Sequence, residues 1–572
     1  MPKYPKKKLA QLLLQACAAH KIDKVVISPG SRNAPLTLGF VNHTDINAYS
    51  IVDERCAAFF ALGLAQQTGK SVALLCTSGS ALLNYYPAIA EAYYSKIPLL
   101  VISADRPEHL IDIGDGQTIR QAGVFSNHIC FQTNLQTQGA RSGSDNQDEM
   151  LANNALKINE ALEISIERMG PVHINVPFDE PLYETVNDLY DFKSLIKGQS
   201  QPVIDTLLTE EPIALEELEK YASVWNNASK KMVLIGSNFP DELIAIQMQY
   251  LIKDPSVIIL TETTSNLSGK KHINCIDQLI FPLDENQFQD LQPDILLTFG
   301  GMVVSKRVKQ FLRNHKPTEH WHIDSHRSLD TFHALTHHFE ISPQLFFSQF
   351  FFLSTVTESD YQAKWDAVKQ KRKLAHKKFL ADAEYSDIKV FDQVLNSLPE
   401  FCNLQLANSS IIRYSQLFEL KPGIKVFCNR GTSGIDGSTS TAIGAALGSV
   451  KQTVLITGDI SFFYDSNALW NKYVPAHFRI ILVNNNGGGI FKFIPGPKAS
   501  DALDFFETTH QLNAASLCKM YDFNYTAASD ENELNEKLSE FYKPSEKPSL
   551  LEIFTPSEKN DLILKDYFKQ LS

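Results

Sequence analysis

Two neighbouring apolar segments of the chain end in residues that could hold a metal ion and a phosphate group. VLITGD ends on Asp459, and RIILVNNNGGGIF (479–491) passes from apolar residues to three asparagines and three glycines. A turn needs only one Asn-Gly pair, so the additional asparagines and glycines indicate a binding role. Carboxylate and amide oxygens suit Mg²⁺, and glycines let the backbone approach a phosphate closely. The alternative is a hydrogen-bonded aspartate beside an ordinary glycine-rich loop.

The elements around these residues predict how they meet. The stretch between the two apolar segments is long enough for one helix, which predicts a right-handed strand–helix–strand unit with parallel strands. Parallel strands bring their carboxyl ends to one edge of the sheet, where ligands of open α/β sheets bind. We therefore expect Asp459, the Asn486 amide and a backbone carbonyl such as that of Gly488 to share one divalent cation.

A similar alternation of apolar and helical segments extends over the whole chain. KVVIS (24–28), SVALLCTSG (71–79) and IPLLVISAD (97–105) are typical of buried strands, with helical stretches between them. At 572 residues the chain is too long for one core. We predict an α/β protein with three doubly wound parallel-sheet domains. The predicted units are a first domain at 1–185, a linker at 186–210, a middle domain at 211–355, a connecting helix at 356–384 and a last domain at 385–572.

Composition narrows the classes of partner. The formal net charge of -12 argues against nucleic-acid binding, which needs a surplus of Lys and Arg, although local arginines can still bind acidic ligands. The cysteines, without a C-x-x-C pair, are typical of reduced thiols in a cytoplasmic protein. No apolar run reaches the ~18 residues of a membrane span, so membrane insertion is not expected. Residues 1–20 are expected to form an amphipathic helix rather than a signal peptide.

Several motifs resemble those of the thiamine-diphosphate enzyme superfamily. Gly-Asp at 458–459 followed by the asparagines resembles its diphosphate signature, and residues 52–105 resemble the pyrimidine-binding domain of acetolactate synthases and pyruvate decarboxylases. The resemblance implies two catalytic residues: Glu54 relays a proton to the cofactor's pyrimidine, and Ile435 keeps the bound cofactor bent into a V. Ile460 replaces the last glycine of the superfamily's usual Gly-Asp-Gly, a change expected to remove some flexibility but to leave the metal bound.

The same resemblance implies a set of cofactor and metal contacts. The implied contacts to thiamine diphosphate come from Glu54, Gly431, Ser433, Ile435, Gly458, Asp459, Asn486, Gly488 and Ile490. Three of these residues, Asp459, Asn486 and Gly488, are expected to bind Mg²⁺ or Mn²⁺.

Further motifs resemble one branch of that superfamily, the 2-succinyl-5-enolpyruvyl-6-hydroxy-3-cyclohexene-1-carboxylate synthase (MenD) family. Those that together carry the resemblance are ISPGSRNAPL (27–36), ADRPEHL (104–110), GQTIRQAG (116–123), NSSIIR (408–413) and NRGTSGIDG (429–437). In the middle domain the resemblance depends mainly on GGMVVSKR (300–307), whose SKR segment is expected to be a loop that carries Lys306. It implies decarboxylation of 2-oxoglutarate and a Stetter-like addition of the succinyl semialdehyde carbanion to isochorismate, in menaquinone biosynthesis.

The implied substrates fit the basic residues of these motifs. Together they bring four carboxylates, and a guanidinium can hold a carboxylate through two hydrogen bonds. The resemblance implies substrate contacts from Ser31, Arg32, Arg106, Gln117, Lys306, Asn408, Ser409, Arg413 and Arg430. Arg32, Lys306 and Arg413 are expected to bind carboxylates, although the sequence does not pair each with a particular one. A single arginine is more often part of a surface ion pair, so the hypothesis depends on their joint placement.

The superfamily also implies a partner chain, and two alternatives stay open. Its cofactor lies between the first domain of one chain and the last domain of another, which implies a homodimer or a homotetramer. The first alternative to a transferase of this branch is another thiamine-diphosphate-dependent 2-oxo acid decarboxylase or carboligase, such as an acetolactate synthase. The second is a non-catalytic protein that binds the cofactor, and intact Glu54, Asp459 and Asn486 argue against it.

Overall fold

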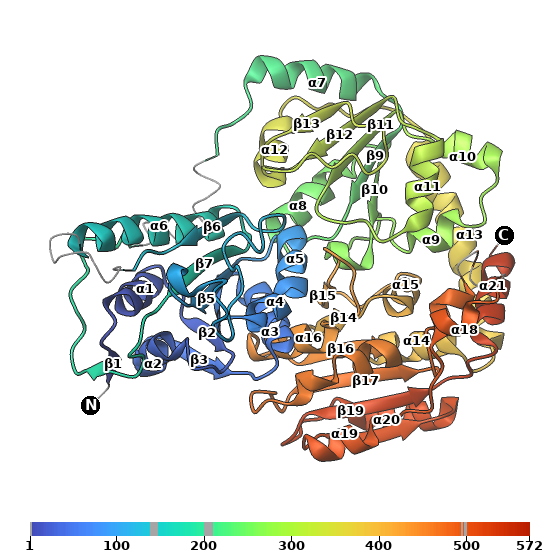
Figure 1. The fold of residues 1–572 in the computed structure, drawn as a ribbon. Coiled ribbons are helices and arrows are strands. Elements are labelled where there is room, and N and C mark those ends of the chain that lie inside the picture. Colours follow the sequence, from blue (N-terminus) through green and yellow to red (C-terminus); the bar gives the residue numbers. More distant parts are fainter. Residues whose placement is uncertain (1–2, 138–146, 199–209, 494–495, 497–499, 572) are drawn as a thin grey trace.

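The chain folds into three parallel sheets with helices on both faces of each, which confirms the predicted fold class (Figure 1). The computed structural model describes residues 3–137, 147–198, 210–493, 496 and 500–571. The predicted linker at 186–210 falls partly on 199–209, outside the described residues. The predicted domain boundaries stay predictions, whereas the strands of each sheet can be stated from the structure.

The first sheet has six parallel strands in the order β3-β2-β4-β5-β7-β6. They are β2 (Lys24–Ile27), β3 (Asn47–Ser50), β4 (Val72–Cys76), β5 (Leu99–Asp105), β6 (Phe131–Asn134) and β7 (Val172–Pro177). The helices are α1 (Lys8–Ala19), α2 (Ala34–Asn42), α3 (Glu54–Thr68), α4 (Ser80–Asn84), α5 (Tyr86–Ser95) and α6 (Gln147–Glu167). Every residue of β4 and β5 is buried, because helices cover both faces.

The middle sheet has five parallel strands in the order β10-β9-β11-β12-β13. They are β9 (Lys231–Ile235), β10 (Val257–Thr261), β11 (Ile295–Phe299), β12 (Glu319–Ile323) and β13 (His337–Phe339). The helices are α7 (Leu215–Asn227), α8 (Glu242–Leu251), α9 (Ile276–Ile280), α10 (Glu285–Leu291), α11 (Lys306–Asn314) and α12 (Pro343–Phe350). The long helix α13 (Tyr361–Asp382) then leads to the last sheet.

The last sheet also has six parallel strands, in the order β15-β14-β16-β17-β19-β18. They are β14 (Asn403–Leu406), β15 (Lys425–Phe427), β16 (Thr453–Gly458), β17 (Phe478–Asn484), β18 (Asn524–Ala528) and β19 (Ser549–Phe554). The helices are α14 (Asp387–Ser397), α15 (Ser410–Ser415), α16 (Ser438–Leu447), α17 (Asp459–Tyr464), α18 (Leu503–Glu507), α19 (Ala515–Met520), α20 (Glu531–Phe541) and α21 (Asn560–Gln570).

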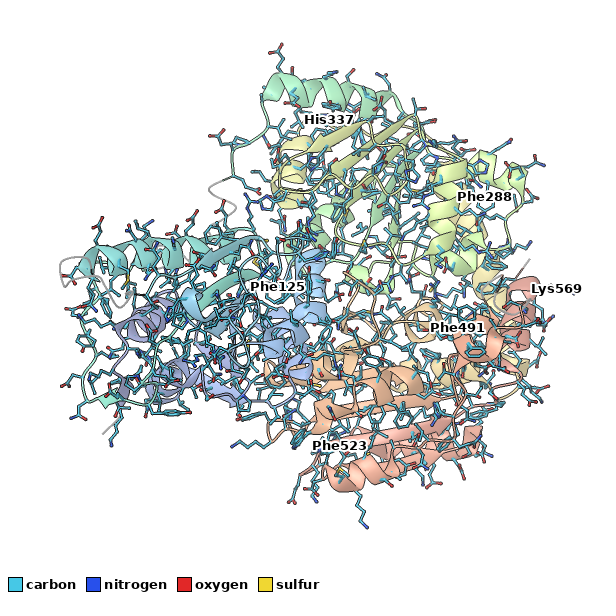
Figure 2. The ribbon with its side chains drawn as sticks, viewed as in Figure 1. Phe125, Phe288, His337, Phe491, Phe523 and Lys569 are labelled. Atoms are coloured by element: carbon cyan, nitrogen blue, oxygen red, sulfur yellow. The ribbon has the colours of Figure 1, made fainter. Side chains whose placement is uncertain are left out.

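The first and last domains share one hydrophobic core. A single buried cluster extends from Phe125 in the first domain to Phe523 in the last, both labelled in Figure 2. Helices α3 and α16 lie against each other in this core, and glycine permits the contact. A Cβ at Gly63 would overlap the Thr441 carbonyl oxygen, and one at Gly444 would overlap that of Phe60. The two outer domains therefore form one packed body, because their backbones touch where side chains are absent.

Two sequence expectations differ from the structure. The single helix predicted between β16 and β17 is two short ones, α17 and the 3₁₀ helix η5 (Ser466–Leu469). Asp465 separates them because its buried carboxylate accepts hydrogen bonds from Ser440 and pairs with Arg55 at 2.9 Å. Lys306 begins helix α11 rather than lying in a loop, since the Ser305 hydroxyl caps that helix at Val308 N. No helix in the described part of the chain is both long and apolar enough to cross a bilayer.

Candidate active site

The carboxyl ends of β16 and β17 bring Asp459 beside the asparagine and glycine run. The two strands pair in parallel with Gly458 opposite Val483. The buried Asp459 carboxylate accepts hydrogen bonds from Gly487 N at 2.9 Å and Ile460 N at 2.7 Å. Burial raises the pKa of Asp459, and these backbone donors oppose that rise by stabilising the charged form.

A segment after α18 covers this corner. His510 N donates to the Asn486 carbonyl at 3.2 Å, and His510 Nε2 lies 3.4 Å from Asp459 Oδ2. That ring nitrogen is buried without a hydrogen-bond partner among the described residues. Gly488 N donates to the Glu507 carbonyl at 2.6 Å, and a Cβ at Gly487 would lie 2.9 Å from the same oxygen. The glycines are needed because the backbone passes too close to α18 for a side chain.

The donors at this edge fit a hard divalent cation and a diphosphate. Carboxylate, amide and carbonyl oxygens come from Asp459, Asn486 and Gly488, and such oxygens are what Mg²⁺ and Mn²⁺ prefer. Within the described ranges no group of three His, Cys, Asp or Glu side chains could hold a metal alone. Phosphate and amide oxygens would therefore have to complete the coordination shell.

The second part of the site is the loop 429–437 before α16. Asn408 holds both sides of it, because its Nδ2 donates to the carbonyls of Asn429 at 2.8 Å and Gly434 at 2.7 Å. The Asn408 Oδ1 accepts from Arg430 Nη1 at 2.7 Å. The half-buried Ile435 follows, and its carbonyl accepts a hydrogen bond from Ser461 in α17 at 2.9 Å. The loop is thereby fixed to the same edge of the sheet as Asp459.

A glutamate from the first domain anchors this loop from the other side. The fully buried Glu91 carboxylate, in α5, accepts hydrogen bonds from Gly431 N at 2.8 Å and Thr432 N at 2.7 Å. It also accepts from the hydroxyls of Thr432 at 2.8 Å and Ser95 at 2.5 Å. Sequence reasoning missed Glu91, and the only available signal was a single acid inside the apolar helical stretch AIAEAYY.

Glu54 is the first residue of α3, and its neighbours fasten that helix start to the last domain. Asp53 caps α3 at Cys56 N and accepts from Asn467 Nδ2 at 2.9 Å. Arg55 donates to the Asp436 carbonyl and pairs with Asp465. The Glu54 carboxylate is half-buried and accepts from Asn84 Nδ2 at 3.3 Å. Glu54 thus stands on a rigid helix end with its carboxylate partly accessible.

The predicted substrate residues of the first domain gather around the turn after β4. Arg106 donates to Asp115 at 2.9 Å, to Ser78 Oγ at 2.6 Å and to the Gln117 carbonyl at 2.7 Å. The exposed Gln117 donates back to the Ser78 carbonyl at 3.2 Å. We call Arg32, Arg106 and Gln117 the first-domain cluster.

Arg32 and Ser31 are the other predicted substrate residues of the first domain. Arg32 donates to the Phe178 carbonyl at 3.0 Å and pairs with Glu180 at 3.2 Å, while its buried Nε has no hydrogen-bond partner in the described chain. Ser31 is exposed beside it. Ser31, Arg32 and Arg106 all follow strands of the first sheet, as their motifs predicted.

The remaining predicted substrate residues gather where the middle and last domains meet. Arg413 in α15 is half-buried, and burial lowers its pKa, which nearby Asp277 raises and Arg430 lowers. Lys309 in α11 is close enough to Arg413 and Arg430 that both help to lower its pKa after burial. We call Arg413, Arg430 and Lys309 the interdomain cluster. Ser409 precedes α15 with a positive φ of 67°, and Lys306 is exposed at the start of α11.

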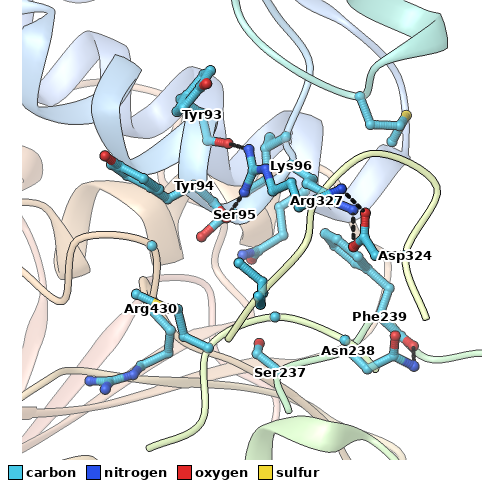
Figure 3. Close-up of a pocket in the computed structure, with 18 of the residues that line it drawn as sticks. Tyr93, Tyr94, Ser95, Lys96, Ser237, Asn238, Phe239, Asp324, Arg327 and Arg430 are labelled. Carbon is cyan, nitrogen blue, oxygen red and sulfur yellow. Dashed lines mark hydrogen bonds and ion pairs between the residues drawn. The ribbon is translucent and has the colours of Figure 1, made fainter. Parts of the chain in front are cut away.

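A pocket of about 710 Å³ lies between the end of α5, the middle domain and residues 426–431 (Figure 3). Lys96 pairs with Asp324 across it at 2.5 Å, and Arg327 donates to the carbonyls of Tyr93 and Tyr94. Of the predicted site residues, Arg430 and Gly431 line this pocket, and the Arg430 side chain extends away from the Lys96–Asp324 pair. The pocket therefore adjoins the active-site loop from the side opposite Asn408.

Comparison with known proteins decides the family. Models of the thiamine pyrophosphate enzymes match three parts of the chain: the N-terminal TPP binding domain at 7–132, the middle domain at 202–406 and the C-terminal TPP binding domain at 410–553. The 2-succinyl-5-enolpyruvyl-6-hydroxy-3-cyclohexene-1-carboxylate synthase of Flavobacterium johnsoniae is 52% identical over 573 residues, covering 100% of both chains. The chain belongs to this synthase family. Synthases of the same name from Christiangramia forsetii and Porphyromonas gingivalis are 52% and 39% identical, covering 98% or more of each chain.

Membership of the synthase family confirms the resemblance read from the sequence motifs. The matched thiamine pyrophosphate domains contain both halves of the site, because Glu54 lies in the N-terminal match and Asp459 in the C-terminal one. Lys306 and Lys309 lie in the middle match. Each of the three domains of this synthase family member therefore carries residues of the candidate site.

Proposed function

We propose that this protein is a transferase that decarboxylates 2-oxoglutarate and joins the remaining four-carbon unit to isochorismate. The product would be 2-succinyl-5-enolpyruvyl-6-hydroxy-3-cyclohexene-1-carboxylate, in menaquinone biosynthesis. The observation that carries the proposal is the identity of 52%, over the full length, to proteins named as the synthase of this product. The Asp459–Gly487 contact supports it, because it forms the expected corner at the carboxyl ends of two parallel strands.

The chain's own residues would hold the cofactor in two places. When bound, thiamine diphosphate supplies a nucleophilic thiazolium carbon and an electron sink for the loss of carbon dioxide. Asp459, Asn486 and Gly488 would hold Mg²⁺ or Mn²⁺ against the diphosphate. Gly431, Ser433, Ile435, Gly458 and Ile490 would line the cofactor. Glu54 would carry and relay a proton at its carboxylate, which Asn84 orients.

Both clusters would contact the substrates, and the interdomain cluster is the better suited to bind their carboxylates. The interdomain cluster is half-buried, so an anion placed there interacts with less screening from water than at the surface. Lys306, Ser409 and Asn408 would complete that side, and Ser31, Arg32, Arg106 and Gln117 would contact substrate from the first domain.

We also propose a homodimer or homotetramer in the cytoplasm. Phe505 and Leu512, on either side of the segment that covers Asn486, are 88% and 54% exposed, which supports a partner surface beside the site. All eight cysteines are free thiols in the structure, as a reducing compartment would allow. Sedimentation analysis with and without cofactor would test the assembly.

Product analysis tests the activity. The protein would be incubated with Mg²⁺, thiamine diphosphate, 2-oxoglutarate and isochorismate, and the adduct followed by mass spectrometry with labelled 2-oxoglutarate. We expect carbon dioxide release and an adduct that retains four carbons of the 2-oxo acid. Carbon dioxide released from pyruvate, with none from 2-oxoglutarate, would favour an acetolactate synthase-like enzyme. Cofactor binding without any turnover would favour a non-catalytic protein.

A further inference from the structure

Two carboxylates of the middle domain, those of the buried Glu262 and the half-buried Asp277, hold the start of helix α11. Glu262 directly follows β10, and its fully buried carboxylate accepts hydrogen bonds from Val304 N at 2.6 Å and Ser305 N at 2.7 Å. The Ser305 hydroxyl accepts from Val308 N and donates to the Asp277 carboxylate. Both oxygens of Glu262 are thus committed to the two residues that precede α11.

Helix α11 places a lysine, Lys309, near two arginines of the last domain, Arg413 and Arg430. Lys306 is its first residue, and Lys309 lies one turn further on, half-buried. Burial lowers the pKa of Lys309, the charge of Glu262 opposes this shift, and Arg430 and Arg413 lower the pKa further, so these groups share one electrostatic environment. The start of α11 therefore decides where Lys309 stands relative to the two arginines.

We infer that Glu262 is a positioning residue through which the middle domain places Lys309 and Lys306 beside Arg413 and Arg430 for the binding of dicarboxylate substrates. The inference deepens the proposed function and rests on it. Glu262 would not touch substrate, because backbone N–H groups occupy both of its oxygens. The inference gives the middle domain a role in substrate affinity, separate from the cofactor contacts of the outer domains.

The protonation of Glu262 offers a readout that a purely structural role would not move. Its pKa is raised to about 7, mainly by burial and also by Asp277, against the opposing effects of the two backbone N–H groups and Arg430. The charged groups that face it are Asp277, Arg430 and Lys309. A protonated carboxyl accepts poorly from two N–H groups at once, so the start of α11 should be held more firmly above pH 7 than below it.

The test measures substrate affinity in Glu262→Gln. With Mg²⁺ and thiamine diphosphate bound, we expect the KM for 2-oxoglutarate to rise about tenfold, which is the effect of losing one charge-assisted hydrogen bond. We expect kcat to change less than about threefold. Wild-type KM should fall as pH rises from 6 to 8, and this slope should disappear in the variant. Affinity for glutarate, followed by calorimetry, should drop by a similar factor, while affinity for the cofactor stays unchanged.

Two further variants keep the test decisive. Glu242→Gln makes the same chemical change at an exposed position of the middle domain and should leave every parameter unchanged. Lys309→Ala should reproduce the higher KM. In the double variant with Glu262→Gln, KM should rise by less than the product of the two single increases. If Glu262→Gln does not fold, Lys309→Ala decides: an unchanged KM and glutarate affinity would overturn the inference.

Other results separate the inference from the proposed function. Wild-type KM and pH slope retained in Glu262→Gln, or equal losses of cofactor and glutarate affinity, would show that Glu262 does not position the substrate side. A wild-type protein that binds glutarate but makes no adduct from 2-oxoglutarate and isochorismate would defeat the proposed function alone, because the glutarate comparison needs no turnover.

Discussion

The first-domain cluster and the interdomain cluster use the same residue type in opposite ways. Arg106 already donates to a carboxylate, a hydroxyl and a carbonyl of its own domain. No hydrogen bond joins the Arg413 guanidinium to another residue of the described chain, and its nearest compensating charge is Asp277. A compensated arginine mainly holds the protein together, whereas a half-buried arginine with unused donors is suited to bind an anion.

Burial increases the difference in uncompensated positive charge between the two clusters. The charges of Arg413 and Arg430 both lower the pKa of Lys309, and Arg430 also lowers that of Arg413, so the interdomain cluster is held together against its own repulsion. A dicarboxylate would relieve that repulsion. In the first-domain cluster Asp115 and Glu180 already provide the negative charge. The four experiments below test this contrast, from the largest expected effect to the smallest.

The largest effect should come from Glu54→Gln, which sets the scale for both clusters. Glutamine keeps the size of the side chain but cannot relay a proton, so we expect kcat to fall about 100- to 10,000-fold. Steady-state turnover of 2-oxoglutarate with isochorismate measures this. Affinities for glutarate and the cofactor's diphosphate should change little. Undiminished turnover would remove Glu54 from the chemistry.

Arg413→Ala should have the next largest effect. Removing one side of a buried charge contact costs about 2–4 kcal/mol, which corresponds to roughly 30- to 1,000-fold in kcat/KM for the acidic substrates. Cofactor affinity, measured by calorimetry, should stay close to that of the wild type. Arg413→Lys should recover only part of the loss, because it restores charge without the two-pronged geometry. An equal loss of cofactor binding would mean that Arg413 belongs to the cofactor site.

Arg106→Ala should cost less than Arg413→Ala if the comparison is right. Its hydrogen bonds hold the segment 115–117 to the turn after β4, and their loss is worth ~1–2 kcal/mol, or about tenfold in KM. Arg120→Ala is the matched control, because Arg120 also pairs with a nearby aspartate, Asp112, but its side chain is 82% exposed. A larger loss at Arg106 than at Arg413 would reverse the assignment of the two clusters.

The smallest effect concerns stability rather than activity. Burial raises the pKa of Glu262 from 4.5 to about 7, so the folded protein disfavours its charge. This unfavourable contribution is absent below pH 4.5, grows as pH rises to about 7 and is then constant. The stability of Glu262→Gln relative to wild type should therefore improve between pH 5 and 7.5. Urea unfolding at several pH values measures it, and a flat difference would contradict the raised pKa.

Much of the fold followed from local patterns. Strands β2, β4, β5, β16 and β17 lie in apolar runs that were predicted as strands, because both faces of a parallel strand are buried. Other strands were not predicted, among them the edge strands β13 and β18: β13 has only three residues, and the exposed and half-buried residues of β18 alternate. Edge strands bury less, so their sequences carry a weaker signal.

Some residues of the candidate site could likewise be predicted from local sequence patterns, and others could not. Asp459 and the asparagine run could be placed together from sequence, because a right-handed crossover has only one outcome for two parallel strands. Glu91 could not be placed, since it meets Gly431 across 340 positions of the chain. Lys309 was missed because it lies on a charged helix with four basic residues, and only the packing of α11 selects one of them.

The sequence alone determined the family, the sheet class and the corner formed by Asp459 and the glycines, because these depend on residue type, apolar period and the handedness of a crossover. The tertiary structure alone decided which arginines are compensated and which remain available, and which carboxylates hold the loops that carry them. Charge compensation depends on burial and on contacts between segments hundreds of residues apart, and no local pattern of residues encodes either quantity.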